Sequence, residues 1–398
     1  RHGYQGTIRT GDPGAATAGE ARILVVDGDR IAFVGEALPE DIGDVALEDL
    51  GDRVLVPAFC DSHLHFASHA LFHGGLDIRT ARSISEIQER LSGFARRSPD
   101  RILLGFGASP ASVLERRLVT REDLDAVCPD RPVFIVKYDG HACTVNRALL
   151  ARLPSEFAAL RGYDATSGQM FQEAYFAVTD HVTNSISPIQ VVKKMVRGVD
   201  GMIARGIGLM HTVSGVGFPR DLDVDLERWF GRGLTSGFAS RVFFQTMDVR
   251  KVLRRKLPRI GGCFATALDG CFGSCDAALH APYRGTEDCG VLFYADAQVA
   301  AFCVEANRAG LQIELHAIGD RAFDQAVFAL QTALDDLPRE DHRHGIIHAS
   351  LPTEAGLETC ARLGIHLPVQ PAFLDWSLEP PDYLEEILGA ARAEKAFL

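Results

Sequence analysis

Short apolar strands alternate with amphipathic helices from about residue 206 onwards. One helix begins near Asp320, and another begins at Thr353 and has Gly364 where a terminating glycine belongs. Alternation of this kind is typical of a parallel sheet. The strands that we predict in this region cover residues 208–213, 241–245, 263–268, 311–316, 345–348 and 366–370.

The first 56 residues have a different pattern. Apolar runs at residues 21–26 and 30–34 flank the step Asp27-Gly28-Asp29, which predicts a β-hairpin. We therefore expect a small β domain over residues 1–56 and a second domain over residues 57–398. We expect residues 70–200 to form an insertion between the first two strands of the second domain. Near the end of this insertion, Ser187 and Pro188 begin a helix.

Another apolar stretch, residues 54–60, leads to His63 and His65. Side chains alternate between the two faces of a strand, so these two imidazoles project from the same face. Neutral imidazole is the commonest protein ligand for zinc and related ions. A lone pair of this kind is also compatible with ordinary polar residues at a strand end, and both interpretations are open at this point.

Counting this strand as the first gives seven strands of a TIM-like (β/α)8 barrel, an α/β fold. The eighth strand is missing, because the chain stops at Leu398 where that strand should begin. Polar residues stand at the C-terminal ends of five strands, which is where the active sites of such barrels lie. Four histidines among them favour a metal site, since catalytic zinc takes about three protein ligands and keeps one position open for water. The residues concerned are His63, His65, Asp269, His316, His348 and Gln370.

Composition excludes several other classes. The 398 residues are 46% hydrophobic and 24% charged, which is ordinary for a soluble globular protein. The formal charge is −12 without a basic cluster, so we expect no nucleic acid partner, and the apolar runs fall short of the ~20 residues that span a membrane. Nine scattered cysteines without a C-x-x-C pair, and no visible secretory signal, predict a cytoplasmic protein with free thiols. Cys263, Cys271 and Cys275 lie close together, and we interpret them as small buried apolar residues.

Five segments resemble the amidohydrolase superfamily, in the branch called amidohydrolase family 3 or YtcJ-like. The matches follow the order of the family and span nearly the whole chain from about residue 20. The block His316-Ala317-Ile318-Gly319-Asp320 is the one most specific to this branch. The matching segments are residues 56–65, 139–146, 268–274, 316–322 and 369–371.

This resemblance implies a metal-dependent hydrolase that acts on a C–N bond of a small molecule, in an amide, formamide or cyclic amide, through a metal-activated water. The expected cofactor is one or two divalent ions, with zinc as the expected metal. The N-terminal domain would be of the β-sandwich type, and the oligomeric state is open, with a homodimer as one alternative. Asp320 has a second interpretation as a helix cap. The implied roles are metal ligation by His63, His65, His316, His348 and Glu173, catalysis by Asp269 and His348, and substrate binding by His141, Asp320 and Gln370.

Three departures from the family pattern keep other functions open. Many relatives bridge two metals with a carboxylated lysine on strand four, but the only nearby lysine, Lys256, precedes this strand, so Lys137 and Glu173 are the candidate substitutes. Ile347 replaces the glutamate before the strand-six histidine, and the strand-eight aspartate is absent. The alternatives are a degenerate barrel that binds a small ligand without hydrolysing it and a mononuclear deaminase. The missing strand implies either a fragment or a naturally short chain.

Overall fold

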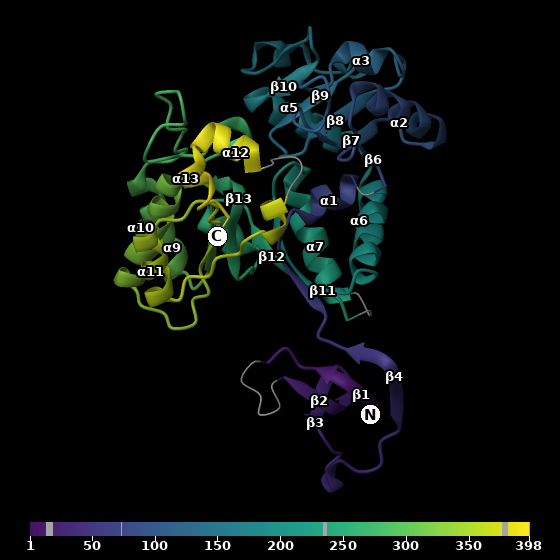
Figure 1. Ribbon diagram of the computed structural model, residues 1–398, viewed down its shortest axis with the longest axis vertical. Coiled ribbons are helices and arrows are strands. Elements are labelled where there is room, and N and C mark those ends of the chain that lie inside the picture. The colour runs from purple at the N-terminus through teal and green to yellow at the C-terminus, as the bar shows by residue number, and fades with distance from the viewer. Residues whose placement is uncertain (13–18, 73, 234–236, 376–380, 398) are drawn as a thin grey trace.

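A computed structural model of the protein describes residues 1–12, 19–72, 74–233, 237–375 and 381–397. Three β-sheets organise these residues. Figure 1 shows the N-terminal sheet at one end of the molecule, a parallel sheet in the middle and the sheet of the insertion at the other end.

The N-terminal sheet has four strands in the order β3-β2-β1-β4. The predicted hairpin is confirmed, because β2 and β3 are antiparallel and meet at Gly28, whose φ of 61° lies in the left-handed region that glycine adopts freely. The β-sandwich type and the domain boundaries stay predictions. The strands are β1 (His2–Arg9), β2 (Glu20–Asp27), β3 (Arg30–Gly35) and β4 (Leu47–Leu55).

A parallel sheet forms the wall of a nearly closed barrel, as the strand–helix alternation predicts. Its six strands lie in the order β5-β11-β12-β13-β14-β15. A seventh strand position follows, because Ile346 N–H donates to His366 O over 2.9 Å and His348 N–H donates to Pro368 O over 3.1 Å. Among the described residues, no eighth parallel strand continues the sheet. The strands are β5 (Phe59–Leu64), β11 (Ile207–Ser214), β12 (Ala239–Phe244), β13 (Arg259–Ala267), β14 (Gln312–Ala317) and β15 (Gly345–His348).

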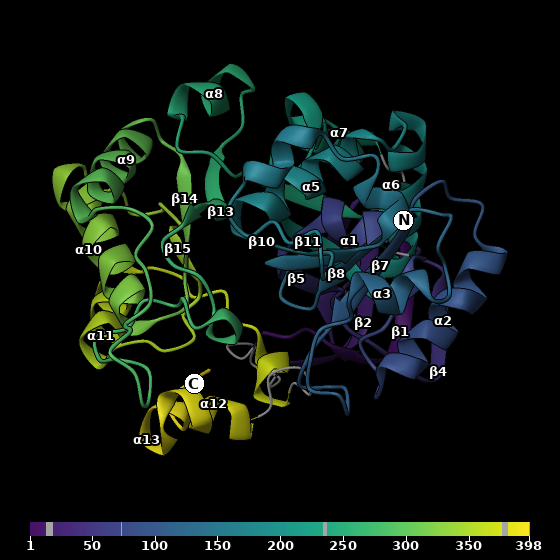
Figure 2. The same ribbon diagram turned by 90° about the horizontal axis from the view of Figure 1, so that it is seen from above.

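Helices cover the outer face of this sheet, and Figure 2 shows α9, α10 and α11 outside β14 and β15. The predicted helix starts at Ser187 and Thr353 are confirmed, because their side chains accept hydrogen bonds from the N–H groups of Gln190 and Gly356. Gly364 ends α11 in the left-handed conformation. No helix in the described ranges combines the length and apolarity needed to cross a bilayer. The helices of the barrel are α1 (Phe66–Phe72), α6 (Pro188–Ile203), α7 (Leu222–Gly233), α8 (Val249–Arg254), α9 (Asp296–Arg308), α10 (Asp320–Asp336), α11 (Glu354–Leu363), α12 (Pro381–Leu388) and α13 (Ala390–Ala393).

The third sheet is built between β5 and β11. It has five strands in the order β10-β9-β8-β7-β6, with four helices beside them. The strands are β6 (Leu76–Asp77), β7 (Leu103–Ala108), β8 (Val133–Lys137), β9 (Ala142–Val145) and β10 (Gln169–Phe171), and the helices are α2 (Ile84–Arg97), α3 (Arg121–Asp125), α4 (Arg147–Leu150) and α5 (Gln172–Asn184).

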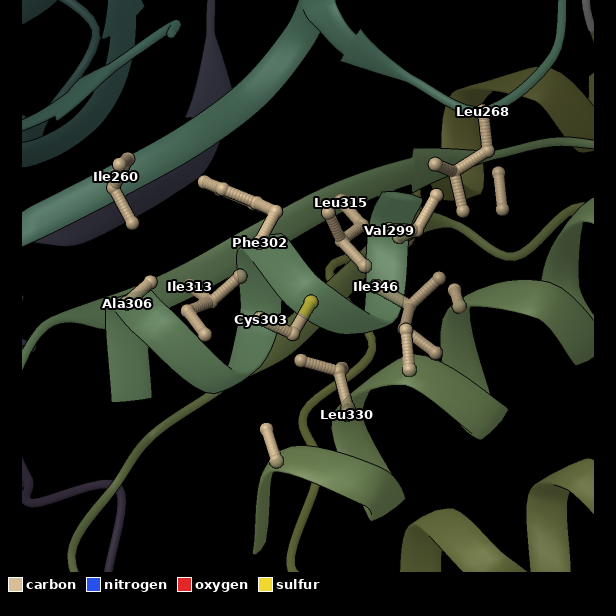
Figure 3. Packing of buried hydrophobic residues seen from close by; sticks show 14 of the residues in the cluster. Ile260, Leu268, Val299, Phe302, Cys303, Ala306, Ile313, Leu315, Leu330 and Ile346 are labelled. Carbon is tan, nitrogen blue, oxygen red and sulfur yellow. The ribbon is translucent and has the colours of Figure 1, made fainter. Parts of the chain in front are cut away.

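The largest core lies between β13–β15 and the helices α9 and α10 (Figure 3). Alternation along β14 sends Ile313 and Leu315 towards the helices, and it therefore sends Glu314 and His316 into the barrel. Leu330 of α10 is fully buried in this core, and truncating such a residue to alanine costs about 2–5 kcal/mol. The packing fixes the C-terminal ends of three strands that carry predicted site residues.

Candidate metal centre

Four histidine rings meet at the C-terminal ends of the barrel strands. His63 lies in β5 and His65 directly follows that strand, whereas His316 lies in β14 and His348 is the last residue of β15. The ring centroids are 5.3 Å apart for His63 and His65, 5.2 Å for His63 and His348, and 4.7 Å for His316 and His348. The structure thus brings together all four histidines that the sequence places at this face.

His348 is held in an unusual conformation. Its φ is 72° and that of Ala349 is 43°, a left-handed region that side chains rarely adopt and that recurs at functional sites. Its Nδ1 donates to Gln370 Oε1 over 2.6 Å, and Gln370 Nε2 donates to Pro368 O over 3.1 Å, which fixes the orientation of the amide. Because Nδ1 carries the proton, Nε2 of the neutral ring has a free lone pair.

Two ring nitrogens of this cluster are buried without a partner among the described residues. His316 donates from Nε2 to Gly270 O over 3.2 Å, so its buried Nδ1 has a lone pair that no hydrogen bond uses. Nδ1 of His63 is likewise buried without a hydrogen-bond partner, and one of the two nitrogens of this ring carries its proton while the other keeps the lone pair. Buried polar atoms normally have partners, and a metal ion is a common reason for an exception.

Electrostatics keep these rings neutral. Burial lowers the pKa of His65 to about 3 and that of His348 to about 4, and neighbouring imidazoles add to the effect. Burial also lowers the pKa of His63 and His316 well below the usual value. Neutral imidazole is the form that binds a metal, so the donor set and its unpaired nitrogens fit a divalent cation.

Cys263 is a further member of the cluster, and the sequence interpretation missed it. This β13 residue is buried, and its Sγ lies 3.3 Å from His63 Nε2 and 3.7 Å from His348 Nε2. His63, Cys263 and His348 are close enough together to hold one ion. Burial raises the pKa of the Cys263 thiol. The signal that could have identified it is its place on strand four, where many relatives carry a metal-bridging lysine.

Comparison with known families decides the classification. A family described as "Amidohydrolase family" matches residues 46–168 and 246–397, which is more than half of the chain. The chain belongs to this amidohydrolase family. The membership predicted from the sequence motifs, in amidohydrolase family 3, is therefore confirmed.

Individual relatives of this amidohydrolase agree with the assignment. The putative amidohydrolase YtcJ of Bacillus subtilis (strain 168) is 25% identical over 385 residues, which are 91% of this chain and 70% of the relative. The N-substituted formamide deformylase of Arthrobacter pascens is 29% identical over 136 residues, which are 33% of this chain and 25% of the relative. An uncharacterized metal-dependent hydrolase from Pyrococcus horikoshii OT3 has the same fold, with a TM-score of 0.74 and 24% identity over 100% of this chain and 79% of that chain. Family membership implies an enzyme of the hydrolase class that uses a divalent metal.

Asp269 of the amidohydrolase lies next to the cluster, but its oxygens are occupied. Oδ1 accepts from Ile318 N–H over 3.0 Å, and Oδ2 accepts from the N–H groups of Ala278 and Gly319 over 2.9 and 2.8 Å. His316 Nε2 is 3.6 Å from Oδ1. Burial raises the pKa of Asp269 to about 7, although the three backbone N–H groups oppose this. The carboxyl group ties the end of β13 to the start of α10.

His141 and Asp320 have different surroundings. His141 is half-buried and its Nδ1 donates to Asp139 O over 2.9 Å, which leaves Nε2 as an acceptor. The His141 ring centroid is 6.3 Å from that of Phe264, which is itself 4.9 Å from His65, so the residue lies beside the cluster. Asp320 lies in the first turn of α10, where its Oδ1 accepts from His280 N–H over 2.9 Å.

Glu173 is not brought to the histidines. It lies in the first turn of α5, is exposed, and pairs with Arg161 Nη2 over 2.8 Å. No contact joins it to any of the four histidines in the part of the chain that the structure describes. We therefore leave Glu173 out of the ligand set proposed below.

A cavity of about 510 Å³ lies beside the centre. Its wall includes Phe264, which contacts the His65 ring, and the aromatic residues Phe176 and Phe218. One carboxylate, Asp180, faces this space, and burial raises its pKa. The cavity has the size and the mainly apolar lining of a small-molecule site.

Proposed function

We propose that the chain is a metal-dependent hydrolase that cleaves a C–N bond of a small molecule, in an amide, a formamide or a cyclic amide. The observation that carries this proposal is the convergence of four neutral imidazoles, with two buried and unpaired ring nitrogens, at the C-terminal face of the barrel. His63, His65, His316 and His348 would hold the ion. A bound divalent ion, with zinc as the expected metal, supplies Lewis acidity towards the substrate carbonyl and lowers the pKa of a water to ~7.

The residues around the histidines have supporting roles in this proposal. Gln370 holds the Nδ1 proton of His348 and so aims Nε2 inward. Asp269 is a positioning residue, because its three hydrogen bonds hold backbone N–H groups, two of them just after His316. His141 Nε2 is free to accept a hydrogen bond from the substrate, since Nδ1 is already committed to Asp139 O.

The neighbouring cavity supports a small and partly apolar substrate. Phe176, Phe218 and Phe264 offer apolar and aromatic contact, and the insertion and the barrel both contribute to its wall. The N-substituted formamide deformylase among the relatives supports a formamide as one candidate. A non-peptide substrate, a cytoplasmic location and a homodimer stay predictions.

The test combines metal analysis with a substrate panel. The full chain is loaded with zinc, and elemental analysis counts the ions per chain. It is then offered N-formyl, N-acyl and cyclic amides and amino-heterocycles, with separate assays for the amine, the carboxylate and ammonia. We expect one or two ions and the formation of an amino group and a carboxylate, in one molecule where the amide is cyclic. A chain that binds no metal contradicts the proposal. Metal binding with only ammonia release from amino-heterocycles supports the deaminase instead, and metal binding without turnover supports a degenerate barrel.

A further inference from the structure

An irregularity in β13 places Cys263 in the cluster. β13 pairs with β14 at Gly262 and Leu315, and the pairing resumes at Ala267 and His316. The four residues 263–266 therefore have no partners in β14, because they lie between two pairs whose β14 members, Leu315 and His316, are adjacent. Bulges of this kind re-aim side chains and are frequent beside active sites.

Glycine makes this bulge possible. Gly261 and Gly262 have φ angles of 99° and 127°, which side chains rarely adopt. A Cβ atom at Gly261 would lie 2.0 Å from the carbonyl oxygen of Glu314, so a side chain does not fit there. The local sequence is therefore suited to turning Cys263 into the barrel.

The distances around the sulfur match a coordination sphere. Tetrahedral zinc with bonds of about 2.0–2.1 Å to nitrogen and about 2.3 Å to sulfur separates the two ligand atoms by about 3.6 Å. Sγ of Cys263 lies 3.3 Å from His63 Nε2 and 3.7 Å from His348 Nε2, which bracket that value. In the metal-free chain the thiol donates its one proton to one imidazole and accepts an N–H from the other, and metal binding replaces both hydrogen bonds.

We propose that Cys263 is a thiolate ligand of the ion held by His63 and His348, on the strand where many relatives carry a lysine. This inference rests on the proposed function. The thiol proton passes to solvent as the sulfur–metal bond forms, so the step needs no oxidant. A thiolate also selects the metal, because soft sulfur favours zinc, cobalt or cadmium over magnesium and manganese.

A second group of possible ligands does not carry the same inference. Cys271 Sγ lies 3.8 Å from Asp139 Oδ2 and 4.0 Å from His141 Nδ1. However, Lys137 Nζ already pairs with that carboxylate oxygen over 2.6 Å, and the His141 nitrogen already donates to a backbone carbonyl. The positive charge of Lys137 works against a cation there.

Cobalt(II) gives a direct test. The metal-free full chain is titrated with Co²⁺, while elemental analysis follows the bound metal and absorption spectroscopy follows thiolate-to-cobalt charge transfer in the near ultraviolet. We expect this band in the wild type, its loss in Cys263→Ser, and its retention in Cys303→Ala, which removes a buried thiol from the core between the sheet and α9. Cys263→Ser should also weaken zinc binding by about 10–100-fold or more.

The outcomes separate this inference from the proposed function. Bound cobalt without the band, or a band that survives in Cys263→Ser, overturns the thiolate ligand but leaves a histidine-bound metal. A chain that binds neither cobalt nor zinc overturns both proposals. If Cys263→Ser does not fold, Cys263→Ala is measured, and circular dichroism of the metal-free proteins verifies that the compared chains are folded.

Discussion

Two histidine clusters lie at opposite ends of the barrel strands, and they differ in how fully their ring nitrogens are hydrogen-bonded. At the C-terminal end, His63 and His316 each keep a buried ring nitrogen without a partner among the described residues. Just before β15, at the other end, His342 and His344 lie with ring centroids 4.5 Å apart, and both are buried. Histidine content and burial alone would suggest two similar sites.

The second pair is fully hydrogen-bonded. His344 Nδ1 accepts from Ile313 N–H and its Nε2 donates to Asn307 Oδ1, both over 3.1 Å. His342 Nδ1 accepts from His344 N–H over 2.9 Å, and its Nε2 donates to Leu363 O over 2.8 Å. No lone pair is left for a metal, so this pair serves the fold.

The pKa does not separate the two clusters. Burial lowers the pKa of His344 to about 3, much as it lowers that of His65 at the other end. The hydrogen bonds of each nitrogen are therefore the better guide to function, and the predictions below test this difference between the two ends.

The largest effect is expected from His63→Ala. This change removes a proposed ligand, so kcat/KM for a hydrolysed amide should fall by at least about a thousandfold, or about 4 kcal/mol of barrier. Elemental analysis should show less metal per chain, whereas the metal-free variant should remain folded. Unchanged metal content and activity would contradict the assignment of the C-terminal cluster.

At the opposite end, His344→Ala should act on stability. It leaves Ile313 N–H without its acceptor and removes one hydrogen bond from Asn307 Oδ1, which keeps Arg339 Nη1 as a donor over 3.1 Å. A buried group left unpaired costs about 1–3 kcal/mol. Denaturant unfolding of the metal-free protein should show a loss of about 1–3 kcal/mol, with the metal per folded chain unchanged. A loss of metal with unchanged stability would reverse the roles of the two ends.

Much of this arrangement was predictable because it depends on local periodicity. The alternation after residue 206 predicts the parallel sheet, and the strand-end positions of His316 and His348 predict their meeting. Ser187 and Thr353 mark helix starts through a local capping interaction that depends on few neighbours.

Contacts that depend on long-range geometry were not predictable. Cys263 reaches the histidines only through a bulge in β13, and strand periodicity does not reveal a bulge. Gln370 and Asp269 share the correct face with the histidines, but only the structure shows that their polar atoms hold other protein groups. The contact between Glu173 and Arg161 likewise depends on how the insertion folds.

A smaller effect is expected for Gln370→Ala. The change removes the acceptor of the His348 Nδ1 proton, so the ring loses its fixed orientation. Removal of such a partner typically costs 10–100-fold in metal affinity or activity. Zinc titration should show this loss, and Gln370→Glu, which keeps an acceptor, should restore most of it. An unchanged affinity would mean that packing alone orients His348.

The pH dependence of stability offers a finer comparison. The folded-state pKa of His344, about 3, lies below its unfolded value near 6.5, so the unfolded chain binds more protons between these values. This contribution to stability is complete above pH 6.5 and is lost as the pH falls towards 3. In His344→Gln, the decline of the unfolding free energy over this window should be shallower by up to about 1.4 kcal/mol per pH unit. Parallel profiles would show that His344 does not titrate on unfolding.

The smallest effect is expected for Glu173→Gln. Its carboxylate is exposed and pairs with Arg161, and exposed ion pairs contribute little. We expect a change of less than about twofold in kcat/KM and an unchanged metal content, with Arg161→Gln as the matched control. A loss of metal in Glu173→Gln, with none in the control, would return Glu173 to the ligand set. In that case the histidines alone would not complete the metal site, and α5 would have to move towards them to bring Glu173 to the ion.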